Sequence, residues 1–386
     1  MTGNRLFRLL VEGWRFLPHS YALVAQAHCL RLAARPEIEL RFADLPFYQP
    51  SWKRASGIFS PLEEETLSAL PAPEPSFTPD ATFTLRPERP DFSTPRSGRR
   101  FAFATAEFGV LTPGNVGDLK SASEVPASVD VITPSRWAAV AYERFGFQPG
   151  RIHVVPHGID PSVFRPDPRS RSAIRATLGV GEACLFFSAG AMTWNKGPDV
   201  LLAAFARVAE RNPDVRLMLK GADALYPSRQ LVDEVLSDLP ARARARVAQR
   251  LIYEGRTVSN KVMAELLCAA DCYVSPYRAE GFNMPVLEAM ACGVPVLCTA
   301  GGPTDDFTDP AFAGRIASRL RKVALDATHT GEALEPDLDH LVALMTETAD
   351  DRAAACARGG LASKRARERF TWEAVTDVLL EALRRR

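Results

Sequence analysis

Residues 280–298 read EGFNMPVLEAMACGVPVLC, and this stretch decides how the second half of the chain folds. Pro285 suits the first position of a helix, where its missing N–H is no loss. Asn283 and Met284 then present backbone N–H groups at the positive end of that helix. Because such an end favours negative charge, the stretch predicts an anion site, most often one for phosphate.

Two carboxylates flank this predicted anion site. Glu280 lies in the loop before the helix and Glu288 lies on its first turns, so that they can reach opposite sides of a bound ligand. Carboxylates accept hydrogen bonds from vicinal hydroxyls, which fits a sugar on one side and a ribose on the other. The alternative is that both are ordinary surface glutamates near a helix start.

The rest of the chain alternates between short apolar strands and amphipathic helices, a pattern that implies parallel sheets with crossover helices on both faces. The strands expected are LFRLLVEG, IELRFADL, RRFAFATAEFG, SVDVITPS, RIHVVPHGID, ACLFFSAGA, VRLMLKGA, RLIYEG, CYVSP and VPVLCTA. Among the helices, one is expected from Tyr21 to about Ala34 with Ser20 as its N-cap, and another from Arg136 to Phe145.

The length of 386 residues suggests two domains, because single cores rarely grow beyond about 250–300 residues. We expect an amino-terminal domain over residues 1–160 and a second domain over 161–370, with a last helix, 371–386, packing back on the first. Few regular elements are expected in the proline-rich region of about 51–100, part of it long, mobile loop.

Composition narrows the class of protein. A formal net charge of +1 gives no electrostatic case for nucleic-acid binding. No apolar run reaches about 18 residues, so no membrane-spanning helix is expected. The start lacks a signal-peptide core. Seven irregularly spaced cysteines favour reduced thiols in a cytoplasmic protein. The basic stretch 241–251 and the terminal arginines could touch anionic lipid at the inner face of a membrane, with a solvated basic face as the alternative.

A second loop carries a candidate phosphate ligand. Residues 190–198 read GAMTWNKGP, and Pro198 again marks the beginning of a helix. Lys196 therefore lies beside a second helix N-terminus, where its ammonium can neutralise a diphosphate; a solvated lysine in a turn is the alternative. Lys196, Arg256 and Glu280 each follow an expected strand, so all three should lie along one edge of the sheet, the usual ligand position.

At this point the sequence resembles a known family. The asparagine-lysine-glycine loop, the stretch 280–296 and the segment VVPHGIDPSVFRP are similar to the retaining GT-B glycosyltransferases of family 4, the glycosyl transferases group 1. The resemblance covers roughly residues 150–375, whereas the amino half is similar only in strand and helix order and in its glycine loop. It implies the GT-B fold, with two Rossmann-like domains whose parallel sheets face a central cleft. A nucleotide-sugar donor would be held mainly by the second domain and an acceptor by the first.

The resemblance also implies roles for individual residues. Lys196 would bind the donor diphosphate, Glu280 the sugar hydroxyls and Glu288 the ribose, while the loop from Arg256 to Val258 would lie against the nucleobase. Gly13, in the first loop, would allow close approach to the diphosphate. The full donor-binding set implied is Gly13, Asn195, Lys196, Arg256, Val258, Glu280, Phe282, Asn283, Met284 and Glu288.

Two positions depart from the family pattern. Ala191 stands where an arginine is usual, so that one phosphate contact is missing or comes from elsewhere, with Arg256 as a candidate. Glu107 follows the strand after which many members carry a histidine; it either contacts the sugar or acceptor or is a plain loop carboxylate. Glu280, Lys196 and Glu107 form the expected catalytic set.

The expected activity is transfer of a hexose from a UDP- or GDP-linked sugar to the hydroxyl of a sugar, lipid-linked glycan or small molecule, with retention at the anomeric carbon. No metal or other cofactor is expected, because Lys196 and the helix N-termini supply positive charge. The one D-x-D match, Asp337 to Asp339, suits an N-cap better than a metal site. The alternatives are a non-catalytic nucleotide-sugar-binding protein of the same fold, which Ala191 and the missing histidine favour, and phosphorolysis or epimerisation on that fold.

Overall fold

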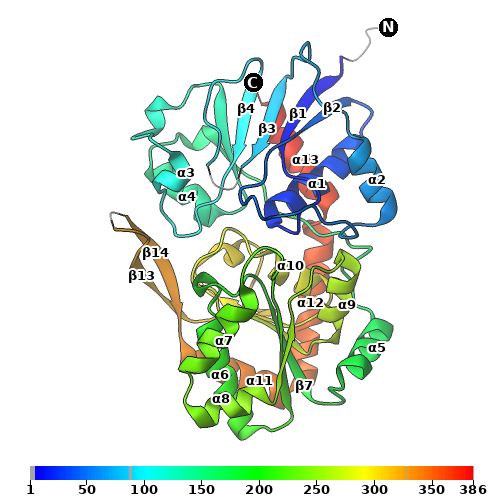
Figure 1. Ribbon diagram of the computed structural model, residues 1–386, viewed down its shortest axis with the longest axis vertical. Helices are drawn as coiled ribbons and strands as arrows, with labels where there is room; N and C mark the ends of the chain where they lie inside the picture. Colours follow the sequence, from blue (N-terminus) through cyan, green and yellow to red (C-terminus); the bar gives the residue numbers. More distant parts are fainter. Residues whose placement is uncertain (1–4, 87–88, 328, 386) are drawn as a thin grey trace. The chain divides into compact units, whose positions relative to one another are not determined.

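The computed structural model describes residues 5–86, 89–327 and 329–385 (Figure 1). Four short pieces lie outside the described residues: the start of the expected first domain (1–4), two residues of the proline-rich region (87–88), residue 328 and the last of the terminal arginines (386). The chain divides into two compact units, one formed by Met1–Gly158 with Trp372–Arg386 and the other by Ile159–Thr371. Within the described residues, no helix combines the length and apolar character needed to cross a membrane.

The first unit is built on a six-stranded parallel sheet with the order β2-β1-β3-β4-β5-β6. Two of its strands, Ala81–Leu85 and Val129–Thr133, are buried at every residue, as expected for parallel strands that are covered on both faces. The strands are β1 (Phe7–Gly13), β2 (Ile38–Asp44), β3 (Ala81–Leu85), β4 (Arg99–Phe103), β5 (Val129–Thr133) and β6 (Ile152–Val154).

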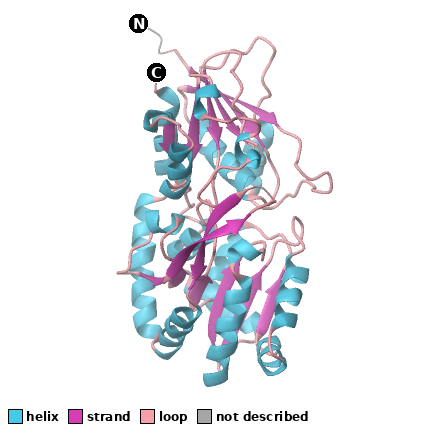
Figure 2. Ribbon diagram, turned by 90° about the vertical axis from the view of Figure 1, so that its left-hand side faces the viewer, coloured by secondary structure: helices cyan, strands magenta, loops and turns pink. Residues whose placement is uncertain are grey.

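Helices pack around this sheet (Figure 2). They are α1 (Ser20–Ala33), α2 (Pro61–Ala69), α3 (Pro113–Val116), α4 (Arg136–Arg144), α13 (Trp372–Arg384) and the 3₁₀ turns η1 (Ala122–Glu124) and η2 (Pro149–Arg151). Ser20 was predicted to be the N-cap of α1, but it is the first residue of the helix. His19 caps the helix instead, because its Nδ1 accepts from the N–H of Tyr21 at 3.3 Å. The chain end joins this unit because α13 packs on α1, where His28 Nδ1 lies 2.9 Å from Thr376 Oγ1.

Residues 51–100 contain few regular elements, as predicted, but the sequence pattern did not identify the two that lie wholly within this region, α2 and β3. Helix α2 begins with a capping box in which Ser60 and Glu63 satisfy each other's backbone N–H groups. Strand β3 lies between β1 and β4 at the centre of the sheet, and all five of its residues are buried. Both elements are short and flanked by prolines, so that the prolines dominated the sequence pattern.

The second unit contains another six-stranded parallel sheet, with the order β12-β11-β10-β7-β8-β9. The first strand of this unit, β7, lies between β8 and β10, so the chain reverses its direction of winding there, and the crevice at such a switch point is the usual ligand position. The strands are β7 (Cys184–Ala189), β8 (Val215–Lys220), β9 (Leu251–Glu254), β10 (Cys272–Ser275), β11 (Val296–Thr299) and β12 (Ala313–Ile316).

Two groups of helices cover this sheet, one around α6 and the other around α9 and α10 (Figure 1). The helices are α5 (Pro168–Leu178), α6 (Pro198–Arg211), α7 (Ser228–Asp238), α8 (Ala241–Ala248), α9 (Asn260–Ala269), α10 (Met284–Ala291), α11 (Leu338–Asp350), α12 (Arg352–Arg369) and the 3₁₀ turns η3 (Trp194–Lys196) and η4 (Pro303–Asp306). An antiparallel hairpin of β13 (Ser318–Ala324) and β14 (Thr330–Pro336), which the sequence did not predict, completes the unit.

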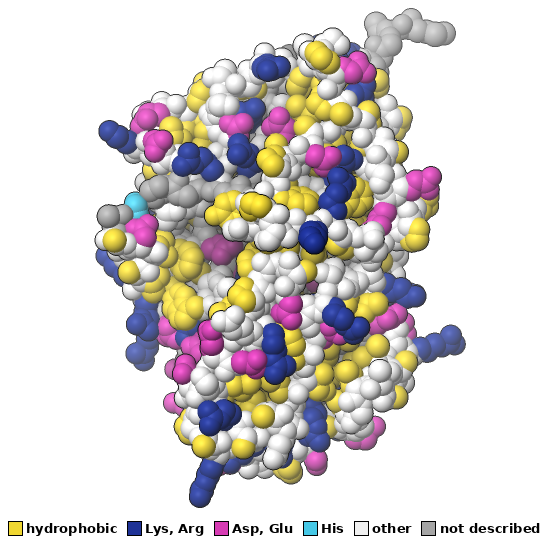
Figure 3. Space-filling model, viewed as in Figure 1, with side chains coloured by type: hydrophobic (Ala, Val, Ile, Leu, Met, Phe, Trp, Pro, Cys, Tyr) yellow, Lys and Arg dark blue, Asp and Glu magenta, His cyan; other side chains and the backbone are white. Residues whose placement is uncertain are grey.

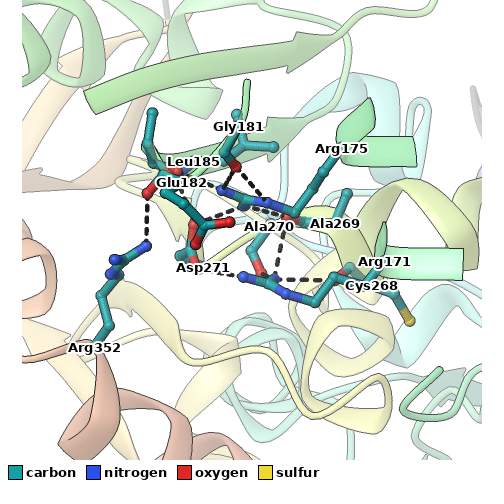
Figure 4. A network of polar contacts seen from close by, with 11 residues as sticks. Arg171, Arg175, Gly181, Glu182, Leu185, Cys268, Ala269, Ala270, Asp271 and Arg352 are labelled. Atoms are coloured by element: carbon teal, nitrogen blue, oxygen red, sulfur yellow. Dashed lines mark hydrogen bonds and ion pairs between the residues drawn. The ribbon is translucent and has the colours of Figure 1, made fainter. Parts of the chain in front are cut away.

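A network of arginines fixes the strand that leads into the switch point (Figure 4). Arg171 and Arg175 of α5 bind the two carboxylate oxygens of Asp271 at 2.6 and 2.9 Å. Their guanidinium groups also donate to the carbonyls that end α9, including that of Ala269. Asp271 in turn accepts from the N–H of Leu185 in β7 at 2.8 Å. The network therefore holds the beginning of β10 against β7.

Candidate functional site

The loops after β7 and β10 are joined at the switch point of the second sheet. The carbonyl of Asn195 accepts from the N–H groups of Arg278 and Ala279 at 2.7 and 3.2 Å, and its side-chain amide donates to the carbonyl of Ala279 at 3.2 Å. Gly197 ends the first loop at a φ of +69°, and a Cβ there would lie 2.0 Å from the carbonyl oxygen of Pro276. Only glycine fits this position, which lets the two loops approach closely.

This pairing brings Lys196 and Glu280 together. Lys196 Nζ donates to Glu280 Oε1 at 2.6 Å. The glutamate side chain is 10% exposed and the lysine side chain 27%. The switch point therefore holds one cation and one strong acceptor side by side. Chemically, the ammonium can bind a phosphate oxygen, and the carboxylate can accept from hydroxyl groups.

Helix α10 begins next to Glu280. Asn283 is its N-cap and has a left-handed backbone, with φ 76°. Its side-chain amide donates to Ser275 Oγ at 2.9 Å and does not cap the helix. Among the described residues no hydrogen bond engages the N–H groups of Asn283 and Met284, so they are available to an anion. Pro285 is the second helical residue, one position later than expected.

Two further members of the expected set lie on α10 and its loop. Phe282 is buried and stacks on Phe307, with ring centroids 4.8 Å apart. Glu288 lies in the second turn of α10, partly buried. Burial raises the pKa of Glu288 from 4.5 to about 7. Since no hydrogen bond holds its carboxylate within the described part of the chain, this group has acceptor capacity for a ligand.

Arg256 and Val258 follow β9, on the same edge of the sheet. The Arg256 side chain is 85% exposed and pairs with Glu254 at 2.6 Å, which holds the pKa of Glu254 below its ordinary value. In the described structure no contact joins Arg256 to Ala191 or Lys196. Ala191 instead uses its carbonyl to accept from Ser228 Oγ at 2.9 Å.

The remaining expected residues belong to the first unit. Gly13 ends β1, and a Cβ there would meet Leu85 and Ala25 only at ordinary contact distances of 3.6 and 3.7 Å. The protein itself therefore does not require glycine at this position. Glu107 lies four residues after β4, and its carbonyl accepts from Trp137 Nε1 at 3.0 Å.

One important residue was missed. Arg278 is 4% exposed; it donates twice to Asp199 at 2.7 Å and also to the carboxylate of Glu335 in β14. Burial by itself lowers the pKa of Arg278, but the hydrogen bonds to these two carboxylates outweigh it and raise the pKa above the ordinary value. Arg278 thus ties the Glu280 loop to the start of α6 and to the hairpin.

The D-x-D sequence is an N-cap, as predicted. Asp337 Oδ1 accepts from the N–H of His340 at 2.8 Å, and Asp339 pairs with Arg207. In the portion of the chain that is described, no group of three or more His, Cys, Asp or Glu residues is arranged to hold a metal ion. Acidic and basic side chains are interspersed on the face shown in Figure 3, in keeping with the balanced net charge.

Solved structures with the same arrangement of sheets define the class of fold. Anabaena HepE in complex with UDP-glucose is similar with a TM-score of 0.68 and 16% identity, over 97% of this chain and 99% of that chain. A glycosyltransferase from Rickettsia africae is similar with a TM-score of 0.69 and 12% identity, over 98% of both chains. The chain has the GT-B fold of glycosyltransferases, as expected.

Sequence comparisons identify the family. Residues 183–319 match the family model described as Glycosyl transferases group 1. The D-inositol 3-phosphate glycosyltransferase of Xylanimonas cellulosilytica is 30% identical over 302 residues, which cover 73% of this chain and 65% of that protein. The mannosylfructose-phosphate synthase of Agrobacterium fabrum is 30% identical over 164 residues, 42% of this chain and 36% of that protein. The chain therefore spans less than two thirds of the length of these relatives. Residues 183–319 are similar to the group 1 glycosyltransferases, which confirms the resemblance.

Proposed function

We propose that the protein transfers a hexose from a nucleotide diphosphate sugar, UDP- or GDP-linked, to an acceptor hydroxyl with retention at the anomeric carbon. The observation that carries this proposal is the Lys196–Glu280 pair, 2.6 Å apart, beside the uncapped start of α10 at the switch point. The names of the relatives support it, since they include glycosyltransferases and a mannosylfructose-phosphate synthase, and HepE binds UDP-glucose.

In this proposal the site binds the charge that develops on the leaving group. Lys196 and the N–H groups of Asn283 and Met284 contact the diphosphate, while Glu280 accepts from the sugar hydroxyls and Glu288 from the ribose. When a donor binds, Lys196 exchanges its partner, from the Glu280 carboxylate to a phosphate oxygen. Donors aimed at a departing phosphate stabilise the transition state more than the ground state.

The proposed chemistry is a front-face substitution. The bond from the anomeric carbon to the diphosphate oxygen breaks, a bond to the acceptor oxygen forms on the same face, and the acceptor proton passes to the leaving phosphate. A double displacement needs a carboxylate on the opposite face of the sugar. The sequence identifies no such nucleophile. For the first unit we keep the roles that the resemblance implies: Gly13 would allow close approach of the diphosphate, and Glu107 would contact the sugar or acceptor. The positive charge of Lys196 and the helix start serves in place of a metal ion.

The test is nucleotide release from a panel of UDP-, GDP- and ADP-sugars with sugar and inositol phosphate acceptors. Replacing Glu280 or Lys196 by Ala should lower turnover about 100-fold or more, as when one transition-state donor is removed. Lys261→Ala is the matched control, because the Lys261 side chain is 82% exposed. Near-normal turnover of either site variant would refute the assignment.

A non-catalytic binding protein is the second candidate, favoured by Ala191 in place of the usual arginine. It would bind a donor saturably without releasing nucleotide. Thermal shift identifies the donor that binds, since bound ligand stabilises by mass action whether or not it reacts. A donor that raises the melting temperature but releases no nucleotide would then identify the binding protein.

A further inference from the structure

Lys220 is a buried cation at the edge of the sheet where the proposed donor binds. It is the last residue of β8 and only 8% of its surface is exposed. Its ammonium donates to the carbonyl of Gly221, just beyond the strand, at 2.6 Å. Within the described residues no carboxylate forms an ion pair with it. By contrast, the ammonium of Lys196 is paired with Glu280.

Glu254, Asp223 and Arg256 are the charged groups that act electrostatically on Lys220. Both carboxylates have closer partners of their own. Glu254 is bound by Arg256 at 2.6 Å, and Asp223 Oδ1 accepts from Tyr253 Oη at 2.5 Å. Burial lowers the pKa of Lys220, and the negative charges of Glu254 and Asp223 oppose this effect only in part. The ammonium is thus buried without a counter-ion in contact.

Such a group is destabilising unless something compensates for it, because taking an ammonium out of water costs several kcal/mol in real proteins. Methionine would fill a similar space without this cost. Residues that violate the rules of packing in this way are commonly found at binding sites, where the ligand supplies the missing interaction.

The position of Lys220 adjoins the loop expected to bind phosphate. The N–H of Gly190 donates to the Lys220 carbonyl at 3.0 Å. The Lys196 stem lies 3.8 Å from where a Cβ of Gly190 would be. Ser228 Oγ joins the two loops, because it accepts from the N–H of Ala222 at 3.1 Å and donates to the carbonyl of Ala191 at 2.9 Å. Lys220 therefore lies beside the loop in which the family usually carries an arginine.

We propose that Lys220 binds the diphosphate of the nucleotide donor and supplies the positive charge that Ala191 lacks. This inference rests on the proposed function, since it assumes a nucleoside diphosphate at the switch point. It replaces Arg256, the earlier candidate for this contact, whose exposed guanidinium is occupied by Glu254.

The experiment compares the full chain with its Lys220→Met variant by calorimetric titration with UDP, GDP, ADP and the corresponding nucleosides. The nucleoside diphosphate that the wild type binds should bind about tenfold or more weakly to the variant, as expected for one lost charge-assisted hydrogen bond. Binding of the nucleoside alone should be unchanged. The variant without ligand should melt at the same temperature as the wild type or higher, because a buried unpaired charge is removed.

A second variant makes the test independent of folding. Adding Ala191→Arg to Lys220→Met should restore most of the lost affinity for the diphosphate. Lys322→Met, at an exposed position on the hairpin, is the matched control and should change nothing.

The outcomes separate the two proposals. Equal affinity of Lys220→Met and wild type for the diphosphate overturns the role of Lys220 and leaves the proposed function intact. Equal weakening for diphosphate and nucleoside also overturns it, because the lysine would then contact the base or ribose. If the wild type binds none of these nucleotides, the proposed function itself fails.

Discussion

Replacing Glu288 by Gln should stabilise the protein at pH 8, although the residue is assigned to donor binding. Burial raises the pKa of its carboxyl from 4.5 to about 7, so the folded state disfavours the ionised form. A difference of this size corresponds to at most about 3 kcal/mol. Because the side chain is only partly buried, solvent screening reduces the expected gain to about 1–2 kcal/mol.

The sign of the effect depends on pH. Below about pH 4.5 the carboxyl is protonated in both the folded and the unfolded chain, and the substitution removes no charge. Between about pH 4.5 and 7 the unfolded chain loses its proton first, so the stability of the wild type falls as pH rises. Above about pH 7 the penalty is fully present. Glutamine has no such pH dependence at this position.

The assay is denaturant unfolding of wild type and Glu288→Gln at pH 4.5 and pH 8, with the exposed Glu368→Gln as control. The Glu288 variant should be more stable only at pH 8, while its affinity for the donor falls. Equal stabilities at pH 8, or the same difference at both pH values, would show that the folded protein does not disfavour this carboxylate.

Three further outcomes are expected. Arg278→Met should cost about 2–3 kcal/mol of stability, because Asp199 and Glu335 lose their partner. Glycosyl transfer by the folded fraction of this variant should also be slower. An unchanged transfer rate would show that the ion pairs of Arg278 do not position the site. Burial lowers the pKa of His28 to about 3. The free energy of unfolding should therefore fall by about 2 kcal/mol between pH values above the unfolded pKa of about 6.5 and pH 5, because only the unfolded chain takes up the proton. The His28→Gln variant should show a smaller fall of the melting temperature over this pH range. Finally, EDTA should leave the transfer rate unchanged, and a severalfold recovery on adding back Mg²⁺ or Mn²⁺ would contradict the proposal that positive charge comes from the protein.

The meeting of Lys196 with Glu280 could be predicted from sequence because it follows from topology. Each residue comes just after an apolar run, and parallel strands end at one edge of a sheet. The apolar runs themselves are unambiguous, since strands such as β7 and β10 are buried along their length. The sequence shows the order of the strands along the chain. It does not show that β7 and β10 are neighbours in the sheet, which is seen only in the structure.

Two of the features that escaped prediction depend on partners distant in sequence, and a third depends on an unusual capping group. Arg278 has no local signal, because its carboxylates lie 79 and 57 residues away, one of them in the hairpin that was not foreseen. Strand β3 is short and contains two threonines, and its burial follows from neighbours on both sides. His19 caps α1 through a ring nitrogen, whereas the usual signal for a helix start is Ser, Thr, Asp or Asn.

Unfavourable local features of this chain are concentrated at the carboxyl ends of its parallel strands. Within the described residues the non-glycine positions with positive φ are Phe16, Met192 and Asn283, and they lie in the loops after β1, β7 and β10. Each such conformation costs about 1–3 kcal/mol and persists only where the surrounding structure enforces it. Lys220 is buried and Glu288 is partly buried, and among the described residues neither has a bonded counter-ion. Both lie at the same edge of the second sheet. Neither strain nor unpaired charge stabilises the fold, and features of this kind are typical of functional sites. Met192, Lys220, Asn283 and Glu288 all belong to the second unit, and their common location at the carboxyl ends of its strands supports a ligand site at the switch point independently of Lys196 and Glu280.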